Sequence, residues 1–560
     1  MNKKIYEDWS KDDLISEIKK LRKRKKYGLV WENKEEDVVE QCKKNLPVLE
    51  EINNKEIKSD NNGNYNIIIE GDNYHSLSVL NYIYNEKIDV IYIDPPYNTG
   101  ARDWKYNNNY VDQEDPYRHT KWISFMYHRL KICKNLLSKD GIICVTIDDH
   151  EFARLWCLLE EIFKEKNFLG SIVIRINPGG RKSKRKIAAQ HEYALYFSKN
   201  SGTQVSQFFM KPEEKSHRYK KGNKGEWYEE RNLRKEGADS LAKPTSERFY
   251  PIYFDPKTKK ISSKVKYKIE ILPIDTNGQK RIWRRSKNDI DLMSKNGEIF
   301  LKRTKSGPQV YFKFKGGLKG ETPKSFWSDV KYSASEHGTR ILDNILGTRE
   351  TFPFPKSPYA TADCIKVANS KKDALILDFF AGSGTTGQSV LELNKQDNGE
   401  RKFILCTNNE NNIAEKVCYP RIMKVIKGYK VNNKKVKGLG GNVKYFKTSF
   451  VPSDYSDKNK ILLTKKATDM ICIKENTFEN IINKNKYKIF KNNNNFTFII
   501  YDQLVLDEIK KIIPKYKGNI KLYIFSLGND LFEEEFDKFI NVSTEPIPES
   551  ILAIYRRLFI

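Results

Sequence analysis

Short apolar runs alternate with helical patterns in two separate stretches of this chain. Between residues 61 and 200, apolar runs such as KIDVIYI stop at Gly, Asp or Pro, and helical patterns such as YHSLSVLNYIY lie between them. The alternation returns between residues 339 and 450, in ALILDFF and RKFILC. Strands that alternate with helices in this way predict an α/β fold built on a mostly parallel, doubly wound sheet.

Three other regions do not belong to these two alternating stretches. Residues 201–338 are rich in Lys, Arg, Gly and aromatic residues, and we expect an inserted domain there. Residues 1–60 are expected to form a polar helical arm that contains the basic run KKLRKRKK, which is either a solvated helix face or a contact for DNA or another partner. Residues 451–560 hold further short strands and helices and predict a small C-terminal α/β domain.

The charge balance narrows the choice of partner. The chain has 101 Lys and Arg against 73 Asp and Glu, a formal net charge of +28, which favours nucleic acid, although a compositional bias towards Lys accounts for part of the excess. No apolar stretch approaches the roughly 20 residues of a membrane span, and the amino end lacks an apolar signal core, so we expect a cytoplasmic protein without membrane contact. The eight scattered cysteines contain no C-x-x-C pair, and no metal site is expected.

A glycine-rich turn, AGSG at residues 381–384, follows the apolar run ALILDFF. Gly382 and Gly384 let the backbone approach a nucleotide-type cofactor closely before a helix begins, although simple packing of a strand on a helix is the alternative. We expect the strand before this turn to end at Phe380 and the next strand to end at Glu410. The Glu410 carboxylate either accepts hydrogen bonds from ribose hydroxyls or is a solvated loop acid. The chain contains no G-x-x-x-x-G-K-[ST] sequence, which excludes ATP hydrolysis on a Walker-type loop.

The tetrapeptide DPPY, residues 94–97, ends the apolar run DVIYI. Ligands of open α/β sheets bind outside the carboxyl ends of the strands, so this rigid segment is expected to project into the site. The Asp94 carboxylate and the Pro95 carbonyl can accept the two hydrogens of an exocyclic amine, and Tyr97 offers an aromatic face on which a base can stack. A turn that merely ends the strand is the alternative. The pattern therefore indicates a site for a nucleobase that carries an amino group.

DPPY together with FAGSG resembles the amino-group DNA methyltransferases, and the DPPY form is typical of those that act on N6 of adenine. The order of the two motifs, with the insertion between them, is similar to the β class, in which a target recognition domain fills that gap. The segments IIIEGDNYHSLSVLNY, HEYALYFSKN, GLGGNVKYFKTSF and PIPESILAIYRR also resemble modification (Mod) subunits of type III restriction-modification systems. The resemblance covers nearly the whole chain and implies a Rossmann-like methyltransferase sheet that uses S-adenosylmethionine.

The resemblance also implies which residues bind the cofactor. The FAGSG segment would hold the methionine part of S-adenosylmethionine, Glu410 its ribose and Asp72 its adenine. Lys356 stands where the family has a cofactor-contacting K-P segment, but here Ser357 separates it from Pro358. The expected cofactor-binding residues are Asp72, Asn73, Lys356, Asp378, Phe380, Ala381, Gly382, Ser383, Gly384 and Glu410, and the expected catalytic residues are Asp94, Pro95, Pro96 and Tyr97.

Methylation of a base within a duplex requires that the base be flipped out, at a cost of a few kcal/mol, and basic residues are needed to hold the DNA. The segment RINPGGRKSKRK, residues 175–186, is expected to be a phosphate clamp, with a solvated loop as the alternative. In the insertion, RIWRRS supplies a second basic and aromatic cluster. The expected DNA-binding residues are Arg175, Arg181, Lys182, Lys184, Arg185, Lys186, Trp283, Arg284 and Arg285.

The predicted function is therefore transfer of a methyl group to N6 of adenine in double-stranded DNA, by the modification and specificity subunit of a type III system. The resemblance implies a homodimer and a separate restriction (Res) subunit with helicase and nuclease parts. Three alternatives stay open: a solitary adenine methyltransferase, an N4-cytosine methyltransferase, and a catalytically silent DNA-binding subunit. The intact Asp94, Tyr97 and glycine-rich turn argue against the last. The recognition sequence does not follow from the resemblance, because the insertion is where such proteins differ.

Overall fold

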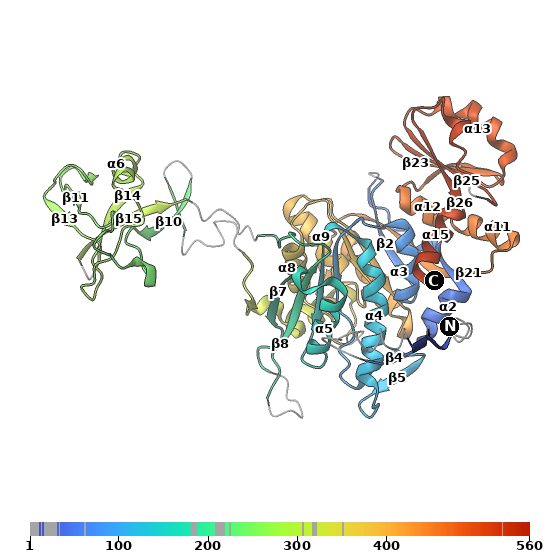
Figure 1. Cartoon of the computed structure of the whole chain (residues 1–560), viewed down its shortest axis with the longest axis horizontal. Helices are drawn as coiled ribbons and strands as arrows, with labels where there is room; N and C mark the ends of the chain where they lie inside the picture. The colour runs from blue at the N-terminus through green and yellow to red at the C-terminus, as the bar shows by residue number, and fades with distance from the viewer. Residues whose placement is uncertain are drawn as a thin grey trace. The chain divides into compact units, whose positions relative to one another are not determined.

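The computed structural model contains two compact units (Figure 1). Unit 1 comprises Met1–Ser206 and Lys324–Ile560, and unit 2 comprises Gln207–Pro323. The structure describes residues 10–12, 14–15, 31–32, 34–60, 63–180, 187–207, 219–222, 226–304, 307–315, 322–349, 352–528 and 530–559. Residues 324–338, which were expected in the insertion, belong to unit 1. The reason is that β16 (Phe326–Trp327) pairs in parallel with β7 (Phe168–Arg175) of the main sheet.

Unit 1 is built on a ten-stranded sheet with the order β1-β21-β2-β18-β17-β3-β6-β8-β7-β16. Its other strands are β1 (Asn45–Glu51), β2 (Tyr65–Glu70), β3 (Ile88–Ile93), β6 (Leu137–Ile147), β8 (His191–Ser198), β17 (Leu375–Asp378), β18 (Lys402–Thr407) and β21 (Asn442–Pro452). Neighbouring strands are parallel except in the pairs β1·β21, β6·β8 and β7·β8. The predicted α/β class with a mostly parallel sheet is confirmed.

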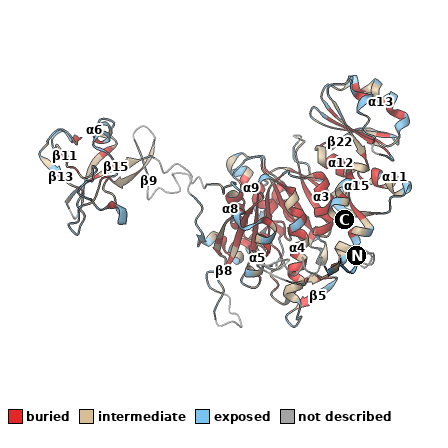
Figure 2. Cartoon of the chain, viewed as in Figure 1, coloured by how far each residue is buried: buried red, intermediate tan, exposed pale blue. Residues whose placement is uncertain are grey.

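Helices cover the sheet in two layers (Figure 1). One layer contains α3 (Asn73–Ile83), α4 (Arg118–Leu136) and α5 (Phe152–Phe163), and the other contains α8 (Pro358–Ala368), α9 (Thr385–Asp397) and α10 (Tyr419–Lys427). The central strands are apolar along their whole length because both of their faces are covered. Figure 2 shows these strands as buried. The sheet therefore forms a rigid base for the loops at its edges.

The order β2-β18-β17-β3 brings four candidate segments to one edge of the sheet. These four strands are mutually parallel, so their carboxyl ends point the same way. Asp72 follows β2, Glu410 follows β18, the AGSG turn follows β17, and Asp94 follows β3. Segments that are far apart in the sequence thus meet where ligands of open α/β sheets bind.

Two strands end earlier than the sequence predicted. Strand β17 ends at Asp378 rather than Phe380, because the Phe380 backbone N–H turns out of the ladder and donates to Asp378 Oδ1 at 2.9 Å. Strand β18 ends at Thr407 rather than Glu410, and the chain then passes through Asn411 in the left-handed region, at φ 52°. Phe380 therefore lies in the loop after β17, and Glu410 begins a short 3-10 helix (Glu410–Asn412) after β18.

The amino-terminal residues contribute to the main sheet. Residues 45–51, expected within a helical arm, form β1, which pairs antiparallel with β21 at the sheet edge after the short helix α2 (Asp37–Lys44). The basic run at residues 19–26 lies outside the described residues. Unit 1 also contains two hairpins outside the main sheet: β4 (Ala101–Tyr106) with β5 (Asn109–Asp112), and β19 (Gly428–Val431) with β20 (Lys434–Lys437).

The C-terminal residues form a second sheet with the order β22-β23-β24-β25-β26. Its elements are α11 (Asp457–Lys466), α12 (Thr468–Glu475), β22 (Glu479–Asn483), β23 (Tyr487–Asn492), β24 (Asn495–Ile500), α13 (Leu506–Ile512), β25 (Asn519–Phe525), α14 (Glu533–Phe536), β26 (Val542–Ile547) and α15 (Glu549–Phe559). Helices α12 and α15 pack on α3, and the Tyr555 hydroxyl donates to the Pro47 carbonyl. This α/β region therefore belongs to unit 1. No helix within the described ranges has the length and apolar character needed to cross a membrane.

Unit 2 consists of two small sheets, β14-β15-β10-β9 and β12-β11-β13, and helix α6 (Lys287–Lys295). Its strands are β9 (Tyr219–Lys221), β10 (Trp227–Asn232), β11 (Ile252–Phe254), β12 (Ile261–Ser262), β13 (Ile269–Ile271), β14 (Ile299–Thr304) and β15 (Gly307–Phe314). Trp283 lies in the core of this unit, 2% exposed, and its indole Nε1 donates to the Tyr250 carbonyl at 2.8 Å. The expectation that Trp283 contacts DNA is wrong, because a buried indole does not reach a surface ligand.

We predict that Trp283→Ala destabilises unit 2 by about 3–5 kcal/mol, since it leaves a large cavity and an unpaired Tyr250 carbonyl. Limited proteolysis and thermal unfolding of the full chain measure this effect. The neighbouring exposed Arg284 provides the matched control, and Arg284→Ala should leave unfolding unchanged. Equal stability of the two variants would contradict a core role for Trp283.

Candidate active site

The DPPY segment is held in place by contacts from neighbouring elements. Asp94 Oδ1 accepts a hydrogen bond from Thr146 Oγ1 of β6 at 2.7 Å and lies 3.2 Å from Lys356 Nζ. The Pro96 carbonyl accepts from Trp122 Nε1 of α4 at 2.7 Å. Both contacts of Asp94 use the same carboxylate oxygen, and the Asp94 side chain remains 26% exposed. The segment is therefore fixed, with part of the carboxylate open to a ligand.

Tyr97 is anchored through its hydroxyl. The hydroxyl donates to Glu192 Oε2 of β8 at 3.0 Å and also accepts from Lys356 Nζ. Burial, with the nearby Asp94 charge, raises the pKa of Tyr97 well above the ordinary tyrosine value, so the phenol stays neutral and can donate. Fixing the hydroxyl also fixes the direction in which the long axis of the ring points.

Lys356 lies with the DPPY residues. Its ammonium group forms an ion pair with Glu192, whose side chain is 1% exposed, and contacts Asp94 and Tyr97. Burial acts to lower the pKa of Lys356, but the carboxylates of Asp94 and Glu192 outweigh burial and raise it. Sequence reasoning linked Lys356 to the cofactor and missed Glu192. The available signal was an acidic residue inside the otherwise apolar run EYALYF.

The AGSG turn is a tight bend that only glycine allows at two positions. Gly382 and Gly384 have φ values of 48° and 78°, in the left-handed region that disfavours other residues. The Gly384 N–H donates to the Ala381 carbonyl at 2.7 Å, and helix α9 begins at Thr385. Asp378 braces the bend by accepting from the Phe380 N–H at 2.9 Å and from Thr386 Oγ1 at 2.5 Å. Asp378 is therefore a support of this loop.

A fully buried arginine lies against the same turn. Arg421 of α10 donates through Nη1 to Ser383 Oγ at 2.9 Å and Thr385 Oγ1 at 2.7 Å, and through Nε to Gln388 Oε1 at 2.9 Å. Burial lowers the pKa of Arg421 to about 10. Its Nη2 is buried and has no hydrogen-bond partner among the described residues. A buried positive charge with a spare donor suits a ligand that carries a carboxylate, as the methionine part of S-adenosylmethionine does. The turn therefore fits this cofactor.

The remaining expected cofactor residues lie along the same sheet edge. Asp72 caps α3 by accepting from the Tyr74 N–H at 2.7 Å, and Asn73 Nδ2 donates to the Phe379 carbonyl at 3.2 Å, next to the AGSG turn. Arg129, only 1% exposed, lies 3.5 Å from Asp72 and contacts Asn73, so it orders both residues. Glu410 lies 3.3 Å from Lys105 and is 41% exposed. The described residues contain no cluster of His, Cys, Asp or Glu that could hold a metal ion.

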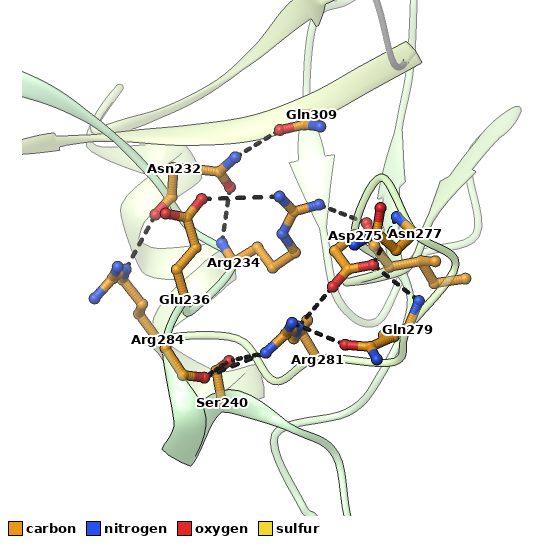
Figure 3. Close-up of polar contacts among 12 residues, drawn as sticks. Asn232, Arg234, Glu236, Ser240, Asp275, Asn277, Gln279, Arg281, Arg284 and Gln309 are labelled. Carbon is orange, nitrogen blue, oxygen red and sulfur yellow. Dashed lines mark hydrogen bonds and ion pairs between the residues drawn. The ribbon is translucent and has the colours of Figure 1, made fainter.

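The expected DNA contacts are dispersed. Arg175 ends β7, and residues 181–186 lie outside the described residues. In unit 2, Arg284 and Arg285 are exposed. Figure 3 shows Arg284 at the edge of a polar cluster, where its Nε donates to the Asn232 carbonyl at 3.2 Å. Arg281, by contrast, is an internal brace that binds Asp275 at 2.8 Å. Unit 2 therefore has two of the predicted arginines on its surface.

We predict a pH-dependent stability effect at Asp378. Burial raises the pKa of this carboxyl to about 7. A carboxyl whose pKa is raised by folding stabilises the protein fully below its unfolded pKa, near 4, and that contribution is lost as the pH rises through about 7. Thermal unfolding should therefore show that the wild type loses stability relative to Asp378→Asn between about pH 5 and about pH 8. A difference in Tm that is the same at both values would contradict the raised pKa.

Comparison with known proteins identifies the family to which this chain belongs. Residues 88–417 match the N6/N4 methyltransferase family described as DNA methylase. The type II methyltransferase M.KpnI of Klebsiella pneumoniae is 35% identical over 347 residues, covering 60% of this chain and 79% of M.KpnI. The EcoPI Mod subunit, a type III restriction-modification enzyme of Escherichia phage P1, is 30% identical over 401 residues, covering 65% of this chain and 61% of that subunit. The match thus spans less than two thirds of the EcoPI Mod subunit.

The solved structures that match this chain have low TM-scores. The cytosine-N4-specific PvuII DNA methyltransferase has a TM-score of 0.33 at 14% identity and covers 68% of this chain and 92% of that chain. The complex of M1.HpyAVI with SAM has a TM-score of 0.29 at 13% identity and covers 64% and 97%. The family match, which covers more than half of the chain, shows that this protein belongs to the S-adenosylmethionine-dependent N6/N4 DNA methylases.

Proposed function

We propose that this chain methylates the exocyclic N6 of adenine in double-stranded DNA, with Asp94, Pro95, Pro96 and Tyr97 as the catalytic segment. The observation that carries the proposal is the position of this segment at the carboxyl end of β3, beside the AGSG turn that follows the parallel neighbour β17. The DPPY form favours adenine over cytosine by its resemblance to N6-adenine enzymes. A cytosine N4 amine is the second candidate, because it offers the same two hydrogens to the same acceptors.

The reacting groups on the protein are hydrogen-bond acceptors. Adenine N6 is a poor nucleophile because its lone pair is delocalised into the ring. We propose that the Asp94 carboxylate and the Pro95 carbonyl each accept one amine hydrogen, which favours a more tetrahedral nitrogen and holds it in line. Bound S-adenosylmethionine supplies the electrophilic methyl group. The nitrogen must lose one proton overall, and we propose that the Asp94 carboxylate accepts it.

Binding of the flipped base is proposed to depend on Tyr97. A flipped adenine loses its stacking partners, at a cost of a few kcal/mol, and an aromatic ring in a fixed orientation offsets part of this cost. The contacts of the Tyr97 hydroxyl with Glu192 and Lys356 support this role, because they hold the ring before a base arrives. Asp72, Asn73, Glu410 and the AGSG turn are proposed as cofactor contacts.

The system in which the enzyme works is also a proposal. Similarity to the EcoPI and EcoP15I Mod subunits, at 30% and 27% identity, supports a modification subunit of a type III restriction-modification system. We further propose that it pairs as a homodimer and works with a restriction subunit. The higher identity to the type II methyltransferase M.KpnI, 35%, supports the alternative of a methyltransferase outside type III systems. Unit 2 is proposed as the target recognition domain, with the exposed Arg284 and Arg285, and Arg175 of unit 1, as DNA contacts.

We predict that Asp94→Ala lowers methyl transfer to DNA by at least about 100-fold, because the amine loses an acceptor that acts in the transition state. Transfer of tritium from labelled S-adenosylmethionine measures the rate. Calorimetry with S-adenosylmethionine and thermal unfolding serve as controls, and both should remain close to wild type. Substantial residual transfer by folded Asp94→Ala would remove the proposed mechanism.

A further inference from the structure

Glu192 is a buried acid with a position that the fold alone does not explain. It lies in β8 between His191 and Tyr193, pairs with Ile174 of β7 and is 1% exposed. Burial raises its pKa, and the Lys356 charge acts against that rise. A carboxylate at such a site is costly unless it is paired and hydrogen-bonded. Its Oε2 accepts from both Lys356 Nζ and the Tyr97 hydroxyl, so both of its partners belong to the candidate active site.

The backbone that carries Lys356 is also fixed. Ser357 Oγ donates to the Lys331 carbonyl at 2.7 Å. A Cβ atom at Gly338 would lie 2.1 Å from the Pro355 carbonyl oxygen, so Gly338 allows this segment to pack closely. Because the backbone at Lys356 is held in this way, the ammonium group of its side chain reaches the carboxylates of both Glu192 and Asp94.

We propose that Glu192 and Lys356 act as a positioning pair that holds the Asp94 carboxylate and the Tyr97 ring in the orientation needed for methyl transfer. Lys356 and Thr146 both engage Asp94 Oδ1, which fixes the orientation of the carboxylate that is proposed to accept the amine hydrogen. Glu192 fixes the Tyr97 hydroxyl and, through Lys356, is linked to Asp94. Neither member of the pair is a catalytic residue, since each acts through another side chain. The inference rests on the proposed roles of Asp94 and Tyr97.

A simple stabilising role is a weaker explanation of the pair. Replacing a buried ion pair by apolar residues of similar volume is often neutral or stabilising, so stability gives little reason to keep one. Here one lysine is shared between two carboxylates and a phenol at the edge of the sheet where the base is proposed to bind. The arrangement sets both the geometry and the charge of the groups around the amine.

The charges around Asp94 predict how the pH–rate profile of methyl transfer changes when Lys356 is replaced. The titratable groups that face Asp94 are Tyr92, Tyr97, Glu192, Lys356 and Asp378. Without the lysine, two carboxylates would share the site with no cation, and one would take up a proton at a higher pH than before. Burial already raises the pKa of Glu192, and loss of the Lys356 charge should raise it further. Because a protonated Glu192 is a poorer acceptor for the Tyr97 hydroxyl, the acid limb of the pH–rate profile should move to higher pH.

The test uses the full-length protein with S-adenosylmethionine and DNA in single-turnover methyl transfer from about pH 5 to about pH 9. In K356M the rate should fall about 10- to 100-fold at neutral pH and recover partly as the pH rises. K356R retains the charge, so its acid limb should stay near that of the wild type. In E192Q/K356M, which removes both charges, the acid limb should return to the wild-type position while the rate stays low.

Binding of S-adenosylmethionine by calorimetry separates positioning from cofactor contact. The Kd should change less than about threefold in K356M and in E192Q/K356M. A loss of binding that matches the loss of rate would make Lys356 a cofactor contact and overturn the inference, as would a wild-type rate and pH profile in K356M. If K356M does not fold, E192Q/K356M decides the question alone, and a wild-type rate in that variant overturns the inference. Full activity of Asp94→Ala would instead remove the proposed function.

Discussion

The parallel pairing of β3 with β17 is the constraint on which the candidate site depends. Ile376 pairs with Val90 and Leu377 with Ile91, so the ends of the two strands lie within about one residue of each other. The AGSG turn and the DPPY segment are thereby brought together although unit 2 lies between them in the sequence. Covered on both faces by helices, the strands cannot shift without exposing apolar surface to water. The separation between the AGSG turn and the DPPY segment is thus set by the sheet.

Buried cations support both of these segments. Arg421 contacts the AGSG turn through Ser383 and Thr385, and Lys356 contacts the DPPY segment through Asp94 and Tyr97. Each pays a desolvation cost, and each directs at least one donor at a residue of the segment that it supports. The rigidity that methyl transfer requires is therefore supplied by charged side chains behind the loops as well as by the sheet itself.

Sequence reasoning predicted the sheet and the location of both motifs, because long apolar runs and glycine or proline breaks are local signals. It failed where a side chain's direction depends on tertiary packing. Trp283 stands between basic residues in RIWRRS, yet its indole points into the core of unit 2. The contact of Lys356 with Glu192 joins segments that no local pattern connects. The roles of the expected site residues in catalysis and cofactor binding stay predictions.

Base-resolved modification mapping of DNA from cells that express the protein would show which base is methylated, with cells that lack the gene as the control. N6-methyladenine should appear at one short sequence motif in the expressing cells and at no such motif in the control. N4-methylcytosine at a motif would retain the amino-methyltransferase site but contradict the proposed base. DNA without any new methylated base, from cells that contain folded protein, would contradict the account of DPPY as a working catalytic segment.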